Sequence, residues 1–212
     1  MHIYLVRHGQ TSWNASQKCQ GHTDIPLDES GTEQASRLVQ VFDSLPLKRI
    51  LTSDLSRAIE TAQPVAAHHN IQIEARFDLR ERSFGDWEGA AFEDLGRFFV
   101  EESLKTGSAA TELRPPNGES LADVWARIER VTEEIHAEHE PILVVTHGGT
   151  CSLLLAKLIG STLESSRAFR FSNTGISTLA RRPDVGLHLQ KYNDTSHLRE
   201  RALVGSVEGP HR

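Results

Sequence analysis

Two histidines in this chain each follow a short apolar run and each stand directly before a glycine. His8 follows residues 2–6, and His147 follows residues 142–146. A strand that ends at an imidazole holds that side chain on a rigid support, and the glycine lets a bound group approach the backbone closely. One such histidine is more often an ordinary packed or solvent-facing side chain. Two in matching contexts favour a site.

Two arginines near these histidines carry the charge that could hold a phosphoryl group. Arg7 is the immediate neighbour of His8, and Arg57 stands where a third apolar strand gives way to a predicted helix. Guanidinium groups bind phosphoryl oxygens through paired hydrogen bonds, and a helix N-terminus adds backbone donors. The ordinary alternative for Arg57 is a surface side chain, and its place at a strand end is what favours the site.

Cleavage of a phosphate ester also requires an acid, and the sequence supplies several candidates. Glu81 lies in a loop-like run, residues 79–89, that contains two glycines and two aromatic side chains. A carboxyl group there could protonate a leaving group. Asp54, Asp86 and Glu88 are equally available on composition, so the residues alone leave the acid open.

The elements that must position these residues predict an α/β fold. The runs 2–6 and 142–146 lack polar alternation, as strands of a parallel sheet with helices on both faces do. Ligands of such sheets bind at the carboxyl ends of the strands. We therefore expect a three-layer α/β/α sandwich with a mostly parallel central sheet. The spacing predicts helices over 31–45, 53–68 (kinked or divided by Pro64), 120–139 and 150–159, and further strands over 177–180 and 187–192.

Length and composition are those of one ordinary domain. The chain has 212 residues, of which 38% are hydrophobic and 25% are charged. We expect a single domain over 1–198, with a covering excursion over about 82–118 that contains a helix through Phe98 and Leu104. Residues 199–212 are polar and glycine-containing, and we expect them to be loosely held.

The charge balance argues against several classes of protein. With 23 Lys plus Arg against 29 Asp plus Glu, we expect neither nucleic acid nor a membrane surface as a partner. The longest apolar stretch, 151–159, is shorter than the roughly 20 residues of a membrane span. The N-terminus has no leader pattern, and Cys19 and Cys151 lack metal-site spacing, so we expect a cytoplasmic protein with free thiols. His136 and His139 lie on a polar helix end, and we expect no metal site there.

Runs in chain order carry a resemblance to a known family. They are LVRHGQTSWN at 5–14, QGHTDIPL at 20–27, residues 53–61, residues 79–89, PNGES at 116–120 and VVTHGG at 144–149. Together they resemble the histidine phosphatase superfamily, the phosphoglycerate mutase-like proteins.

The resemblance implies a role for each candidate. His8 would attack phosphorus and become a phosphohistidine, without a metal or cofactor. Arg7, Arg57 and His147 would hold the phosphoryl group, and Glu81 would protonate the leaving alkoxide and then activate water. The residues implied to line the site are Asn14, Gln20, Gly21 and Gly148, with Cys151 close by.

The family contains both phosphatases and mutases. SFGDWEG at 83–89 and YNDTSHL at 192–198 resemble the phosphatases, and the chain lacks the His-Tyr-Gly run, Thr-Gly-Trp segment and paired-arginine insertion of the mutases. We expect hydrolysis of a small phosphorylated metabolite. The alternatives are a 2,3-bisphosphoglycerate-dependent phosphoglycerate mutase and, more remotely, an idle scaffold that binds phosphorylated ligands. The substrate and the oligomeric state, a homodimer included, stay open. Four aromatic residues either wall a substrate pocket or pack in the core: Phe84, Trp87, Phe92 and Phe98.

Overall fold

The computed structural model describes residues 1–184 and 186–199. The predicted tail therefore lies outside the described residues, except for Arg199. The elements in chain order are β1 (His2–Arg7), α1 (Ser12–Ala15), α2 (Glu29–Phe42), β2 (Arg49–Ser53), α3 (Ser56–His69), β3 (Ile73–Arg76), η1 (Phe77–Leu79), η2 (Gly85–Trp87), α4 (Phe92–Thr106), α5 (Leu121–Arg127), α6 (Glu129–Ala137), β4 (Ile142–Thr146), α7 (Gly148–Leu158), η3 (Ser165–Ala168), β5 (Ile176–Arg182), β6 (Gly186–Asp194) and η4 (Ser196–Leu198).

A six-stranded sheet runs through the centre of the molecule in the order β3-β2-β4-β1-β5-β6. The pairs β3–β2, β2–β4 and β4–β1 are parallel, whereas β1–β5 and β5–β6 are antiparallel. Arg7 pairs with Thr146 in the register of β1 and β4. The two strands therefore end at the same level, and the residues that follow them, His8 and His147, leave the sheet side by side.

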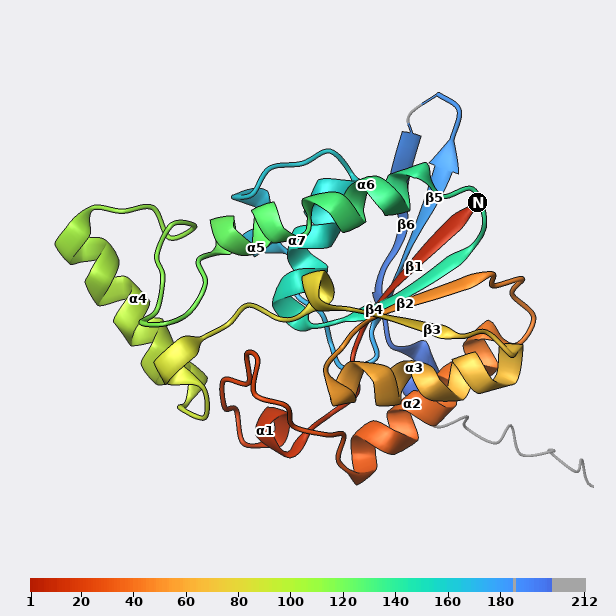
Figure 1. The fold of residues 1–212 in the computed structure, drawn as a ribbon, viewed down its shortest axis with the longest axis horizontal. Helices are drawn as coiled ribbons and strands as arrows, with labels where there is room; N and C mark the ends of the chain where they lie inside the picture. The colour runs from red at the N-terminus through yellow and green to blue at the C-terminus, as the bar shows by residue number, and fades with distance from the viewer. Residues whose placement is uncertain (185, 200–212) are drawn as a thin grey trace, which may run out of the picture.

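Helices cover both faces of this sheet, which confirms the predicted three-layer fold (Figure 1). On one face, Leu38 and Phe42 of α2 and Val65 of α3 pack with Tyr4 and Val6 of β1. A second cluster fills the opposite face, beneath α5, α6 and α7. Its members include Ile3, Leu5, Val124, Ile135 and Leu154. Every residue of β4 is buried, as its unbroken apolar sequence predicts.

The structure corrects the predicted helix 120–139. It is two helices, because Ile128 leaves helical geometry with φ −81° and ψ 0°. The Thr132 hydroxyl donates to the Ile128 carbonyl at 2.7 Å, a type of bond that bends helices. Arg127 thus becomes the last residue of α5.

Three smaller differences concern α3, β3 and α7. Pro64 does not divide α3, in which the missing proline N–H removes a single intrahelical hydrogen bond. No predicted strand corresponds to β3, a four-residue edge strand with two charged residues. The helix predicted from residue 150 begins at Gly148, directly after His147.

The excursion over 82–118 contains the expected helix, α4, which lies beyond the carboxyl ends of the parallel strands (Figure 1). Its inner side packs through Leu95 onto Cys19 and Phe84. The Arg82 guanidinium lies 4.6 Å from the Phe99 ring centroid and donates to the Leu113 carbonyl at 2.8 Å. These contacts hold the excursion together and attach it to the loop at Cys19. Within the part of the chain that the structure describes, no helix has the length and apolar character needed to cross a membrane.

Candidate active site

His8 lies at the carboxyl end of β1 with only 3% of its surface exposed. Its Nδ1 lies 2.7 Å from the Gly9 carbonyl oxygen. A carbonyl oxygen only accepts, so Nδ1 carries the proton and Nε2 keeps its lone pair. Burial, and then the charges of Arg7 and Arg57, hold the pKa of His8 well below its ordinary value, so the ring is neutral at pH 7.

His147 is fully buried and caps the start of α7. Its Nδ1 accepts a hydrogen bond of 3.1 Å from Nε of Arg57. Burial, followed by the charge of Arg57, lowers the pKa of His147 well below its ordinary value. The neutral ring must then carry its proton on Nε2, which has no hydrogen-bond partner among the described residues. Its centroid lies 5.1 Å from that of His8, and the rings are inclined at 61°.

Arg57 is fully buried, and Arg7 is half-buried with its Nε shielded from solvent. Arg57 donates to the carbonyls of Gly21 and Thr23 at 2.8 and 2.9 Å, which fixes its guanidinium. Burial lowers the pKa of Arg57 to about 10, so it remains charged at neutral pH. Arg7 donates from Nη1 to the Phe171 carbonyl at 2.8 Å, while its Nε finds no acceptor in the described part of the chain.

Arg7 Nε and His147 Nε2 are thus two buried donors without an acceptor in residues 1–184 and 186–199. An unsatisfied buried donor costs about 1–3 kcal/mol, so such groups in a native protein demand an explanation. An anion that accepts from both donors supplies one. The arrangement can therefore bind a phosphoryl group beside the lone pair of His8.

The Glu81 carboxylate accepts hydrogen bonds at the N-terminus of α7. Its Oε2 lies 3.0 Å from the Gly149 nitrogen, and its Oε1 lies 3.2 Å from that of Thr150. The Arg82 nitrogen also donates to Oε1 at 2.9 Å. Glu81 lines the same cavity as Arg7, which places a carboxyl group beside the anion site.

The three rival carboxylates have other partners. Asp54 accepts two hydrogen bonds from Arg80, at 2.7 and 2.8 Å. Asp86 accepts from the Asn117 amide on the surface. Glu88 lies in the loop after Glu81, and its carboxylate oxygens accept hydrogen bonds from the backbone nitrogens of His22 and Thr23. It therefore joins this loop to residues 22–23. The cavity is lined by Glu81 and by none of these three.

Three of the four predicted lining residues are linked to a candidate histidine or arginine, and the fourth, Gln20, is buried without such a contact. The Asn14 side chain accepts from Asn173 at 3.2 Å, and Asn173 also donates to the His8 carbonyl at 3.0 Å. Gln20 is buried, and its Oε1 lacks a partner among the described residues. Gly21 supplies the carbonyl that orients Arg57. A Cβ on Gly148 would lie 3.5 Å from Arg7 Nε.

Sequence reasoning missed three residues that orient the site. Thr61 accepts from the Gly9 nitrogen at 2.9 Å, Asn173 donates to the His8 carbonyl, and His22 Nε2 lies 2.9 Å from the Glu81 carbonyl. Each is a single polar residue with no spacing pattern. Only the tertiary fold reveals these contacts.

The cavity beside Arg7 and Glu81 has a volume of about 380 Å³ and one apolar wall. The wall is formed by Phe84, Phe92, Leu121, Phe169 and Phe171. Of the two alternatives given for the four aromatic residues, the pocket wall applies to Phe84 and Phe92. Packing applies to Trp87 and Phe98, whose ring centroids lie 5.3 Å apart outside this cavity.

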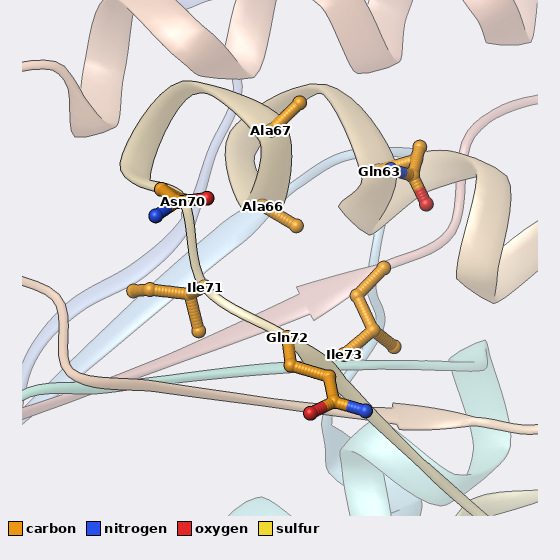
Figure 2. Close-up of a pocket in the computed structure, with 7 residues that line it drawn as sticks. All are labelled: Gln63, Ala66, Ala67, Asn70, Ile71, Gln72 and Ile73. Carbon is orange, nitrogen blue, oxygen red and sulfur yellow. The ribbon is translucent and has the colours of Figure 1, made fainter.

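A separate hollow of about 370 Å³ lies where α3 ends and β3 begins (Figure 2). It is lined by amide, alanine and isoleucine side chains, without a charged group. It lies at the amino end of β3, whereas the histidines follow the carboxyl ends of their strands. We assign it no part in the chemistry.

Neither cysteine is an accessible thiolate. Cys19 and Cys151 are free and buried. Burial raises the pKa of Cys151 well above its ordinary value, which disfavours the reactive form of this thiol. Within residues 1–184 and 186–199, no group of three or more His, Cys, Asp and Glu side chains is arranged to hold a metal.

The fold is that of an α/β protein whose buried donors gather at the carboxyl end of its sheet. The family model of the histidine phosphatase superfamily (branch 1) matches residues 3–195 of this chain. The chain belongs to this family.

Named relatives cover most of the chain. It is 33% identical to the phosphoglycerate mutase-like protein 4 of Arabidopsis thaliana, over 99% of this chain and 92% of the relative. It is also 33% identical to the adenosylcobalamin/alpha-ribazole phosphatase of Escherichia coli, over 80% of this chain and 85% of the relative. Among solved structures, a mycobacterial glucosyl-3-phosphoglycerate phosphatase in complex with VO3 superposes with a TM-score of 0.80 at 27% identity, over 92% of this chain and 99% of that one.

Proposed function

We propose that this protein is a phosphatase that hydrolyses small phosphomonoesters through a phosphohistidine on His8, without a metal. The observation that carries the proposal is the pair of hydrogen bonds that gives two adjacent imidazoles opposite tautomers. His8 keeps a lone pair on Nε2, while Nε2 of His147 carries an N–H without an acceptor among the described residues. The relatives named as phosphatases support the same reaction class.

In the first step, Nε2 of His8 attacks phosphorus and the bond from phosphorus to the ester oxygen breaks. Arg7, Arg57 and His147 neutralise the charge on the equatorial oxygens. The leaving oxygen takes a proton from Glu81 and departs as the alcohol. The apolar wall beside Glu81 offers this alcohol a binding surface.

In the second step, water attacks the phosphohistidine and Glu81 accepts its proton. The phosphorus–nitrogen bond breaks, the electron pair returns to His8, and inorganic phosphate leaves. The sum is one water and one ester converted to one alcohol and one phosphate, with the enzyme restored. Asn14, Gln20, Gly21 and Gly148 line the site in this scheme.

Mutase activity is the competing candidate, because one of the relatives is named a phosphoglycerate mutase-like protein. A mutase must keep water from its phosphoenzyme until a second acceptor arrives. The cavity beside Glu81 has an apolar wall and is lined by three arginines, Arg7, Arg82 and Arg170. Arg82 and Arg170 each already donate to two carbonyls. A small acceptor with several negative charges has few free cations there, which favours hydrolysis.

The proposal extends to the setting of the enzyme. We place it in the cytoplasm, as a single domain over 1–198 whose partner is a small phosphorylated metabolite. Its net charge of -6 and its two buried free cysteines support this setting.

The decisive experiment combines two assays. Purified protein with a chelator present should release nitrophenol from 4-nitrophenyl phosphate, and His8→Ala should not. With 3-phosphoglycerate, we expect phosphate release that does not depend on added 2,3-bisphosphoglycerate. Fast, bisphosphate-dependent formation of 2-phosphoglycerate would show a mutase instead. No turnover of either ester, with phosphorylated ligands still bound, would show an idle scaffold.

A further inference from the structure

The segment that carries Glu81 is irregular, yet side chains from other elements hold its backbone. The Thr146 hydroxyl donates to the Leu79 carbonyl at 2.5 Å, and the Thr150 hydroxyl donates to the Arg80 carbonyl at 2.7 Å. These bonds replace the ladder that a helix or strand would supply. The position of Glu81 therefore depends on individual side chains.

Arg127 makes the largest contribution to this support. From the end of α5, its Nη1 donates to the carbonyls of Asp78 and Arg80 at 2.9 and 3.1 Å. Its Nη2 donates to the carbonyl of Glu81 at 3.0 Å. Its side chain is only 12% exposed, so these bonds are largely shielded from water.

Glu119 holds the guanidinium of Arg127 and the far side of the segment. Its two carboxylate oxygens accept from Nε and Nη2 of Arg127 at 2.9 and 3.0 Å. It also pairs with Ser83 twice, because its Oε2 accepts from the Ser83 nitrogen and its own nitrogen donates to the Ser83 carbonyl, both at 2.9 Å. Arg127 and Glu119 thus hydrogen-bond the backbone before Glu81, at Asp78 and Arg80, and after it, at Ser83.

We propose that Arg127 and Glu119 are positioning residues that set the Glu81 carboxyl group for proton transfer to the leaving oxygen. The inference rests on the proposed function. Neither side chain lines the cavity, so both act through Glu81. A planar arginine–carboxylate pair has the fixed geometry that this task needs, which lysine cannot reproduce. A misplacement of about 1 Å can cost about 100-fold in rate.

Leaving-group chemistry separates positioning from general structural support. An ester of an acidic alcohol such as 2,4-dinitrophenol leaves without protonation, whereas an alkyl ester requires the acid. A misplaced Glu81 therefore harms alkyl phosphates far more than dinitrophenyl phosphate. A merely loosened structure harms both to the same degree.

The experiment measures kcat/KM for 2,4-dinitrophenyl, 4-nitrophenyl, phenyl and alkyl phosphates. Glu81→Gln should lose roughly 100- to 10,000-fold on alkyl phosphate and little on the dinitrophenyl ester. Arg127→Lys and Glu119→Gln should lose about 10- to 100-fold on alkyl phosphate and less than about 3-fold on dinitrophenyl phosphate. The matched control is Arg49→Lys, which breaks an arginine pair with Glu74 and Glu134 outside the cavity and should leave the profile of the series unchanged.

Two outcomes would overturn different statements. An equal loss across the series in Arg127→Lys and Glu119→Gln, with a steep loss in Glu81→Gln, would overturn the positioning role alone. A flat loss in Glu81→Gln would overturn the proposed acid itself. If Arg127→Lys does not fold, Glu119→Gln decides. Glutamine keeps the shape of the side chain, but it has one acceptor oxygen and cannot accept from both Nε and Nη2 of Arg127.

Discussion

The imidazoles of His8 and His147 lie with centroids 5.1 Å apart, and their neighbours give them opposite tautomers. The Gly9 carbonyl accepts a hydrogen bond from His8 Nδ1, whereas His147 Nδ1 accepts one from Nε of the Arg57 guanidinium. The same ring type thus supplies a lone pair at one position and a donor at the other. The chemistry of the site depends on this difference.

The tautomer of His147 predicts unequal effects of two amide substitutions. Glutamine can place its NH2 group near the position of Nε2, whereas asparagine reaches only as far as Nδ1. We expect His147→Gln to lose about 10-fold in kcat/KM and His147→Asn to lose about 100- to 1,000-fold, the effect of removing a charge-stabilising donor. Steady-state assays with 4-nitrophenyl phosphate test this. Equal losses would argue against a donor at Nε2.

Burial of both neutral histidines predicts that stability falls in mild acid. The pKa of each lies well below 6.5 in the folded protein, whereas the unfolded chain titrates near that value. Below about pH 6.5 the unfolded state therefore binds more protons than the folded state does. The free energy of unfolding then falls as pH falls. The slope should be about 1 kcal/mol per pH unit for each histidine. Urea unfolding between pH 7 and 5 should show a shallower slope in the double variant His8→Gln, His147→Gln. An unchanged slope would contradict the neutral assignment.

Gly149 leaves room for the acid. A Cβ there would lie 2.6 Å from Glu81 Oε1, so Gly149→Ala should displace the carboxylate and reduce kcat/KM for alkyl phosphates by about 10-fold or more. The matched control is Gly96→Ala in α4, where a Cβ meets nothing within 4 Å. It should leave activity unchanged and stabilise the fold by about 0.5–1 kcal/mol. Full activity of Gly149→Ala would mean that Glu81 is not held where the structure places it.

The apolar wall predicts an effect on substrate binding. Phe92 lines the cavity and is 49% exposed, so a bound aryl group would cover it further. Burial of about half a phenyl ring contributes roughly 1 kcal/mol, and Phe92→Ala should raise KM for phenyl phosphate about 5-fold with kcat nearly unchanged. Leu104→Ala removes an exposed apolar side chain of the same helix outside the cavity and should change neither constant. A fall in kcat alone would contradict a binding role for this wall.

The sequence was most informative where a residue follows a strong element. Two buried strands ending in histidine predicted the convergence of His8 and His147, because adjacent parallel strands end at the same edge of a sheet. It was least informative about the break at Ile128, where the Thr132 hydroxyl donates to the Ile128 carbonyl. That break lets Arg127 end α5, and no periodicity could reveal its contacts with the Glu81 segment. The residues alone left the acid open and the resemblance implied Glu81. The tertiary contacts also favour Glu81 over Asp54, because Asp54 is paired with Arg80.

The central claim is that His8 becomes phosphorylated during turnover. Rapid quenching of the enzyme with excess 4-nitrophenyl phosphate, followed by peptide mass spectrometry in alkali, tests it directly. The account predicts one phosphoryl group on the peptide that contains His8, stable in alkali and lost in acid, and absent from His8→Ala. Substrate turnover at the normal rate with no phosphorylated His8, or with His8→Ala fully active, would contradict it.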